Sequence, residues 1–251
     1  MKLKGYFVLF CVLAVLTFVG IGLWHTHQQV CEKVVITIQN PSNDTILTEK
    51  QVADLLSPLH LEGTSFKQIH RSEIERQLRQ NVWIDSLVNL SNRGSSLVVT
   101  VKVKEPFLAI FPVSGDPYYI DATGGFLPNH PNIKSQRMVV NGRVTTGYSK
   151  GCKIQSLKNK TLFEAYTIIQ HLQEFPHLAD QFSQLFVTDK GEFELYNSLG
   201  QHIVVLGHSD NMSHKLQQLS QVYDYALVHL GMNTYKTLDV RYKNRVFGIK
   251  K

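Results

Sequence analysis

The spacing of apolar residues changes along the chain, from one long uninterrupted run to many short amphipathic segments. The run YFVLFCVLAVLTFVGIGLW occupies residues 6–24 and contains no charged residue. As a helix rising ~1.5 Å per residue it would extend ~29 Å, close to the ~30 Å hydrocarbon core of a bilayer. The pattern therefore predicts a transmembrane helix. The side chains expected to anchor it are Tyr6, Phe7, Leu13, Leu16, Phe18, Leu23 and Trp24.

The flanks of this run favour a retained anchor with a cytosolic N-terminus. A cleaved signal peptide is the competing interpretation, but it has a shorter apolar core and a small-residue cleavage site. Here the run ends in Trp24-His25-Thr26-His27. Lys2 and Lys4 precede it and no Lys or Arg follows before Lys33, so the positive-inside bias leaves residues from about 25 onward outside. We expect a single-pass type II protein of the inner (cytoplasmic) membrane.

The next segments predict a strand–helix–helix–strand–strand module. In order, they are a strand at 34–38, a helix opened by the capping box of Thr48 and Gln51, a helix opened by Ser72 and Glu75, a strand at 83–90, and a strand at 97–104 after a turn at 92–95. The last strand alternates, with Leu97, Val99, Val101 and Val103 on one face and Thr100, Lys102 and Lys104 on the other. We expect one buried and one wet face, and an end at Pro106.

From residue 107 onward short strands dominate. The predicted strands are 118–120, 126–127, 138–140, 185–188, 192–196, 202–206, 237–242 and 245–249. Two amphipathic helices interrupt them, one at 162–172 and one at 212–230 with Gly231 as its C-cap. The whole chain is therefore predicted as α+β: a single N-terminal transmembrane helix, a β-α-α-β-β module, and a mixed β-rich domain with two helices.

The composition of the chain argues against nucleic-acid binding and against a disulfide. The chain has 251 residues and a formal net charge of +6, but no run of five or six basic residues, and aromatic residues do not interleave with Lys and Arg. This argues against nucleic-acid binding. With Cys11 inside the apolar run, and Cys31 and Cys152 far apart, we expect the last two to remain unpaired.

The sequence offers no convincing catalytic, cofactor-binding or metal-binding set. His208-Ser209-Asp210 contains three triad residue types, but a tripeptide cannot place a base in line with its nucleophile. His25 and His27 lack further ligands for a metal, and His202, His208 and His214 are predicted as scattered surface residues. A membrane-anchored envelope enzyme, such as a glycosyltransferase, stays open as an alternative, although no D-x-D pair is present.

Three local motifs stand in a fixed order behind the predicted span. Residues 81–88 (NVWIDSLV) lead into 97–109 (LVVTVKVKEPFLA), residues 119–125 read YIDATGG, and residues 238–242 read LDVRY. In this order they resemble the FtsQ/DivIB family of bacterial cell-division proteins, whose patterns are V-x-E-x-x-P-x-A, Y-x-I-D-x-x-G and D-x-R-Y. The first match is approximate, because Lys104 and Glu105 directly precede Pro106.

The resemblance implies an architecture and a role. The implied segments are a cytosolic tail at 1–5, a transmembrane helix at 6–24, a juxtamembrane linker at 25–33, a POTRA domain at 34–105 and a β-domain at 106–251. The implied role is a non-enzymatic scaffold of the divisome at the septum. Its implied partners are the single-span proteins FtsB and FtsL, with other division proteins bound through the POTRA module. POTRA modules also occur in outer-membrane assembly factors, but no barrel-like run of alternating strands follows here.

The last predicted strand is the candidate partner-binding site, because an uncovered edge strand can accept an extended partner segment as a further strand. The candidate residues are Tyr242, Arg245, Val246, Phe247, Gly248 and Ile249. Phe247 is the expected anchor, and Gly248 would permit close approach of a neighbouring group. The alternative is that this strand pairs only within the domain, and that Arg245, Lys250 and Lys251 protect its outer edge.

Overall fold

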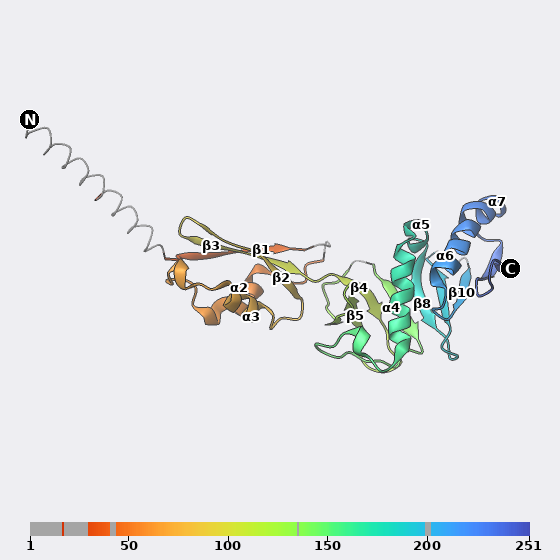
Figure 1. Ribbon diagram of the computed structural model, residues 1–251, viewed down its shortest axis with the longest axis horizontal. Coiled ribbons are helices and arrows are strands. Elements are labelled where there is room, and N and C mark those ends of the chain that lie inside the picture. The colour runs from red at the N-terminus through yellow and green to blue at the C-terminus, as the bar shows by residue number, and fades with distance from the viewer. Residues whose placement is uncertain (1–16, 18–29, 41–43, 135, 199–201) are drawn as a thin grey trace, which may run out of the picture. The chain divides into compact units, whose positions relative to one another are not determined.

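Two sheets organise the chain. The computed structural model describes Thr17 and residues 30–40, 44–134, 136–198 and 202–251, and it has the mixed, β-rich α+β character that the sequence predicts (Figure 1). The chain divides into two compact units. The first ends at Val103, and the second comprises Ser42–Asp44 and Lys104–Lys251.

The first unit has the predicted strand–helix–helix–strand–strand order. Its elements are β1 (Lys33–Gln39), α2 (Glu49–Leu56), the 3₁₀ turns η1 (Ser57–Leu59) and η2 (Phe66–Gln68), α3 (Arg71–Leu78), β2 (Ile84–Arg93) and β3 (Ser96–Val103). The sheet order is β1-β3-β2, with β1 parallel and β2 antiparallel to β3. Both β1 and β2 are therefore edge strands of this sheet.

The alternation of β3 creates the core of the first unit. Leu97, Val99, Val101 and Val103 are at most 1% exposed. Thr100, predicted on the wet face, is instead only 7% exposed. The reason is that β3 is the central strand, so the side chains of β1 and β2 on either side cover part of its second face.

The helix starts are set by local hydrogen bonds. At α2 the predicted capping box forms, with the Gln51 N–H donating to Thr48 Oγ1 and the Thr48 N–H donating to Gln51 Oε1. At α3 the predicted box of Ser72 and Glu75 is wrong, because the helix already begins at Arg71. Glu75 accepts from Arg71 Nε at 2.7 Å, so its carboxylate braces the first turn instead of capping it.

Neither described cysteine is bridged, as predicted. Cys31 and Cys152 are both free and belong to different units. Cys31, predicted in the linker at 25–33, is fully buried in the first unit, where its N–H donates to the Thr64 carbonyl. Burial raises the pKa of its thiol.

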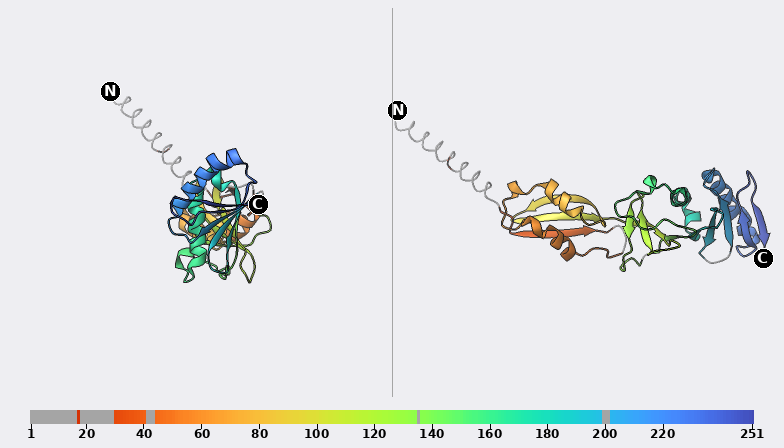
Figure 2. Two further views of the ribbon diagram at one scale, coloured as in Figure 1. Left: turned by 90° about the vertical axis from the view of Figure 1, so that its right-hand side faces the viewer. Right: turned by 90° about the horizontal axis from the view of Figure 1, so that it is seen from below.

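The second unit is a mixed sheet with helices packed on one face (Figure 2). Its strands are β4 (Pro106–Ile110), β5 (Tyr118–Asp121), β6 (Phe126–Pro128), β7 (Met138–Gly142), β8 (Phe182–Val187), β9 (Phe193–Asn197), β10 (Ile203–Gly207), β11 (Tyr235–Asp239) and β12 (Phe247–Lys250). Its helices are η3 (Ile154–Ser156), α4 (Lys160–Gln173), α5 (Pro176–Ala179), α6 (Met212–Gln221), η4 (Val222–Leu227) and α7 (Val228–Leu230). The order of the strands in the sheet is β12-β11-β10-β9-β8-β7-β4-β5-β6.

Proline 106 does not end a strand, contrary to the prediction. β3 stops at Val103, and Pro106 is the first residue of β4, where it pairs with Asp121. A proline is tolerated at the first residue of a strand because its missing N–H lies outside the regular ladder. The two residues before it, Lys104 and Glu105, connect one sheet to the other.

The predicted helix over residues 212–230 changes its winding at Val222. The stretch η4 is π-helical and carries more residues per turn than an α-helix. Within it Leu227 is buried and Ala226 only partly so, and Leu230, the last residue of the predicted amphipathic helix, is 56% exposed. Gly231 ends the helix as predicted, with a φ of 88° that favours glycine.

The predicted anchor lies outside the described residues, apart from Thr17. Within the described part of the chain, no helix combines the length and the apolar character needed to cross a bilayer.

Candidate partner-binding edge

The candidate site is the β11–β12 hairpin at one edge of the nine-stranded sheet. β11 joins the sheet through parallel pairing with β10, in which Ile203, Val204 and Val205 face Thr237, Leu238 and Asp239. β12 runs antiparallel to β11 and pairs with no other described strand. The predicted last strand is thus real and lies at a sheet edge.

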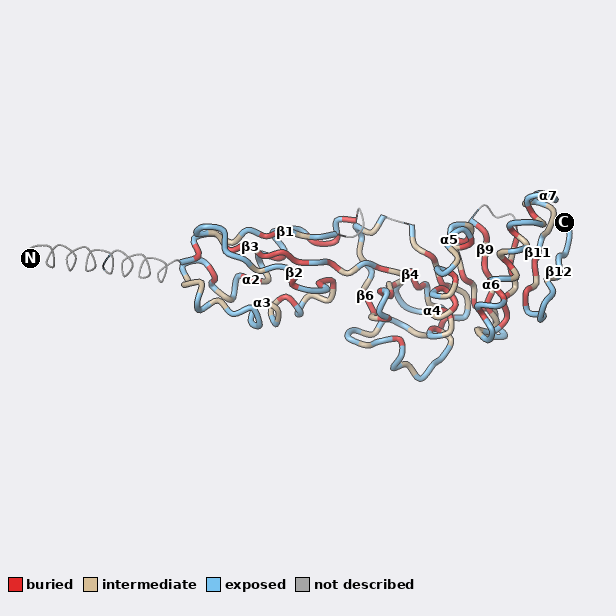
Figure 3. Tube along the Cα trace, turned by 45° about the horizontal axis from the view of Figure 1, so that its top comes forward, coloured by how far each residue is buried: buried red, intermediate tan, exposed pale blue. Residues whose placement is uncertain are grey.

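Every residue of β12 is exposed (Figure 3). Phe247 is 49% and Ile249 is 61% exposed, although both are large and apolar. An edge strand presents main-chain donors and acceptors on its outer side. β12 therefore combines main-chain hydrogen-bonding capacity with large apolar side chains that are about half exposed or more.

The close approach expected at Gly248 is made by an aromatic ring. Tyr235, in the paired strand β11, lies so near that a Cβ at position 248 would come within 2.5 Å of its Cδ1 atom. The ring occupies the space that any other side chain at 248 would need. A residue larger than glycine at this position would have to displace the ring from the main chain.

The boundaries of both strands differ from the prediction, since residues 240–246 form the connection. Asp239 ends β11 because its carboxylate accepts from the Arg241 N–H at 3.1 Å, an Asx-type turn. The same carboxylate accepts from Arg241 Nη2 at 2.7 Å, and Arg241 Nη1 reaches Glu192 on the neighbouring part of the sheet at 3.1 Å. Asn244 has a φ of 60° and allows the chain to reverse.

Electrostatics reinforce this turn. Burial alone would raise the pKa of the Asp239 carboxyl. Hydrogen bonds from the side chain and main chain of Arg241, together with the positive charge of Arg241, hold this pKa below its usual range.

A residue of helix α6 also binds the connection. With its amide oriented for hydrogen bonding, Gln218 accepts from the N–H groups of Asn244 and Arg245 at 2.6 and 2.9 Å.

The six predicted site residues divide into strand and loop positions. Phe247, Gly248 and Ile249 lie in β12, whereas Tyr242, Arg245 and Val246 lie in the connection, so the prediction of a strand from Arg245 is wrong. The structure nevertheless brings two of them together, because the Tyr242 and Phe247 rings pack edge to face with centroids 4.8 Å apart. Val246 instead packs partly against the core.

Further exposed apolar residues lie on the helix that leads into β11. Tyr225 and Val228 are each 70% exposed, in addition to Leu230. Tyr225 and Val228 were not among the predicted site residues, although a helical period that buries Leu219 and Tyr223 leaves both off the buried face. The signal that could have found them is a pair of large apolar residues on the exposed face of a predicted helix.

The residues considered for catalysis make contacts that stabilise the fold. His202, predicted on the surface, is 4% exposed, and its Nε2 lies 2.5 Å from the Tyr223 hydroxyl. His208 contributes its carbonyl to Lys215 Nζ at 2.8 Å, and the Asp210 carboxylate approaches the same ammonium at 3.3 Å. In residues 30–40, 44–134, 136–198 and 202–251, no three His, Cys, Asp or Glu side chains are grouped to hold a metal. His25 and His27 lie outside these ranges.

Comparison with protein families matches both units of the chain. A model described as FtsQ/DivIB, C-terminal related, matches residues 105–248. The chain belongs to the FtsQ/DivIB family. A second model, of a POTRA-like domain, matches residues 29–102. No curated protein matches the chain significantly. The family is one of non-enzymatic cell-division scaffolds, so the two matches support a role in cell division.

Proposed function

We propose that this protein is a membrane-anchored, non-enzymatic scaffold of the bacterial divisome that captures an extended segment of a single-span partner along β12. The partner class is that of FtsB and FtsL. The observation that carries the proposal is the position of β12, a strand of four exposed residues that pairs on one side with β11 and on the other side with no described strand.

The recognition would divide between main chain and side chains. An added strand gains affinity from main-chain hydrogen bonds, and its alternate side chains gain selectivity from the surface that they meet. Phe247 and Ile249 offer apolar area at the centre of this surface. Arg241 and Asp239 hold the connection that presents it.

The location at the division site depends on the predicted anchor. The uncharged run at residues 6–24 supports a single-pass, N-in arrangement in the inner membrane, with both units on the far side. External protease applied to intact spheroplasts should then digest almost the entire chain. N-terminal sequencing that finds a mature chain beginning near His25 would contradict a retained anchor.

Side-chain and main-chain contributions can be tested separately with a purified FtsB-type partner. Phe247→Ala and Ile249→Ala remove exposed side chains, so we expect unchanged melting temperatures but an affinity lowered by about tenfold. Val113→Ala, at a residue 66% exposed outside the hairpin, is the matched control and should leave binding unchanged.

Proline substitutions test the strand itself. Successive N–H groups of an antiparallel edge strand point alternately toward its neighbour and outward. Of Gly248→Pro and Ile249→Pro, one therefore removes an outward donor and should weaken binding. Because a proline at 248 also meets the Tyr235 ring, Gly248→Ala is its control for crowding, and the melting temperature of each variant is measured beside its affinity. Unchanged affinity in folded alanine and proline variants would refute strand addition at β12, and the class of envelope enzymes would then regain weight.

A further inference from the structure

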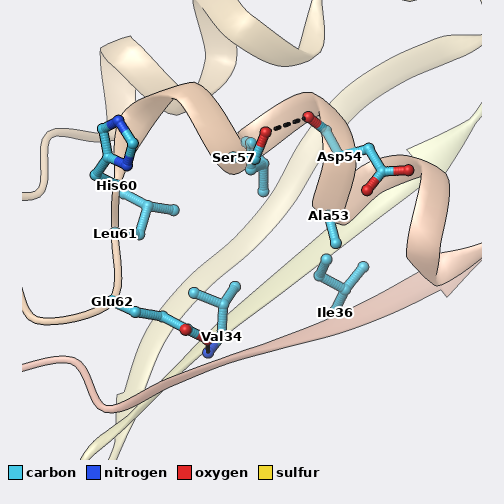
Figure 4. A pocket seen from close by; sticks show the side chains of 9 residues that line it. Val34, Ile36, Ala53, Asp54, Ser57, His60, Leu61 and Glu62 are labelled. Carbon is cyan, nitrogen blue, oxygen red and sulfur yellow. Dashed lines mark hydrogen bonds between the residues drawn. The ribbon is translucent and has the colours of Figure 1, made fainter.

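The first unit carries a groove between its edge strand β1 and the helix α2, distinct from the β12 edge (Figure 4). Its volume is about 410 Å³, within the ~300–1,000 Å³ of sites that bind small ligands or a few side chains. Its apolar lining is Val34, Ile36, Leu56 and Leu61. Figure 4 shows Val34 and Ile36 rising from β1 toward the helix side of the groove.

The rim of this groove is acidic. The Asp54 and Glu62 side chains stand at it, both residues are exposed, and no Lys or Arg is among the residues that line the groove. The chain as a whole carries a formal net charge of +6. A negatively charged groove would attract a cationic group. It would also repel acidic segments, which the net positive charge of the protein would otherwise attract.

The rim is also held in a defined shape. The Ser57 hydroxyl donates to the Asp54 carbonyl at 2.8 Å, and the His60 N–H donates to the Ser57 carbonyl at 3.1 Å. His60 has a φ of 45°, and its carbonyl accepts from Thr64 Oγ1 at 2.8 Å. These bonds fix the end of the helix over the groove, so the site is formed before any partner arrives.

The neighbouring strand edge suggests how a partner would lie. β3 is the only described strand that pairs with β1. A segment added beside β1 would place alternate side chains on the same side as Val34 and Ile36, which is where the groove lies. Glu62 already accepts from the Val34 N–H through a long 3.4 Å bond, so a partner carbonyl could take this donor and leave the carboxylate for a cation.

We propose that the groove between β1 and α2 is a second docking site, which takes an extended peptide segment with apolar side chains and a Lys or Arg between them. The proposal does not depend on β12, and it gives the first unit a binding role of its own. The apolar side chains enter the groove beneath α2, and the negative charges of Asp54 and Glu62 at its rim favour the cation.

The test uses the full-length chain in mild detergent with methyl labels on Val, Ile, Leu and Ala. The probes are peptides that alternate Val with Thr and carry Lys, Gln or Glu at the central position. We expect saturable shifts of the methyl groups of Val34, Ile36 and Ala53, with the Lys peptide binding about fivefold tighter than the Glu peptide.

Matched variants assign the two components of binding. Asp54→Asn with Glu62→Gln should abolish the preference for Lys, whereas Asp85→Asn, an exposed carboxylate on the opposite edge strand β2, should preserve it. Ala53→Phe should fill the groove and remove binding of all three peptides. The fluorescence of Trp83, which is 5% exposed, reports in a Trp24→Phe background whether the first unit of each variant stays folded.

Absence of shifts with every peptide, equal affinity for the Lys and Glu versions, or shifts confined to β2 or β12 would overturn the proposal. Because FtsB-type binding is measured at another surface, failure here leaves the function proposed for β12 intact. Likewise, if β12 does not bind an FtsB-type partner, the methyl shifts of Val34, Ile36 and Ala53 still test the β1 groove independently.

Discussion

The ring of Tyr235 packs against the main chain of Gly248 across the β11–β12 pair, which leaves no room for a Cβ at position 248. The two residues are diagonal neighbours, because Tyr235 pairs with Lys250 and Leu238 pairs with Gly248. An aromatic side chain in this position shields the main chain of a glycine that would otherwise lack side-chain packing.

Replacing this glycine should therefore destabilise the hairpin through Tyr235. Gly248→Val forces the ring away, and we expect a loss of about 1–2 kcal/mol in the free energy of unfolding. Tyr235→Ser relieves the crowding, so the double variant should lose less than the sum of the single losses. Urea unfolding of the four proteins measures this coupling, and strictly additive losses would show that the ring and the glycine are independent.

Asp121 should be essential to the β5–β6 hairpin. Its Oδ1 atom accepts from the N–H groups of Thr123 and Gly125, each at 2.8 Å, and from the Thr123 hydroxyl at 2.7 Å. Asp121→Ala leaves these donors without an acceptor and should cost about 2–3 kcal/mol. Asp121→Asn keeps one oxygen and should cost clearly less in thermal unfolding. Equal losses in the two variants would assign the effect to the charge near Lys104 rather than to the turn.

The buried His202–Tyr223 pair predicts a pH dependence of the second unit. Burial lowers the pKa of His202, so the unfolded chain binds the proton more readily than the folded one. The stabilising contribution is complete above the unfolded pKa of about 6.5 and is lost as the pH falls through the folded value. His202→Gln should flatten stability between about pH 7 and pH 5 in circular dichroism melts. An unchanged slope would mean that His202 is not buried in neutral form.

Asp239 should contribute to stability in a lower pH window. Because its folded pKa is depressed, its contribution is present above the unfolded value of about 3.9 and is lost as the pH falls through the folded value. Asp239→Asn should cost about 1 kcal/mol near pH 7, since its partner Arg241 is partly exposed. The difference between wild type and variant should vanish in strong acid, and a difference that persists there would point to packing instead of charge.

Local patterns predicted most of the fold because many elements carry their own signals. The capping box at Thr48 and the alternation of residues 97–103 depend on near neighbours alone, and both appear in the structure. The prediction that a strand ends at Pro106 was wrong because it depends on residues far away in the sequence. Whether a proline ends one strand or begins another depends on which sheet the chain enters next, and that is a long-range property.

The sequence predicted a last strand at a sheet edge, and β12 is such a strand, but its bounds differ from the prediction. Period-two reading extended the last strand back to Arg245, whereas Asp239 and Gln218 bind main-chain N–H groups in the connection and delay the strand to Phe247. Tyr235 and Gln218 lie outside residues 245–249. The alternation of apolar and polar residues within that segment therefore could not predict their contacts with the hairpin. His202 was missed because its partner Tyr223 lies on a helix more than one element away.

The complete exposure of β12 also bears on how firmly this strand is held. Detaching it uncovers little apolar surface, because its four residues are already accessible and the buried core residues of this region, Leu238 and Val240, precede it. Such a strand can open by local unfolding at far less cost than the global transition, and its amide hydrogens should exchange with solvent earlier than those of β8 or β9. In the proposed strand addition, a partner would bind only the attached form of β12, so its apparent affinity would scale with the attached fraction. Tyr235 and Gln218, which hold the hairpin from within the domain, would then tune the capture of a partner by shifting this local equilibrium.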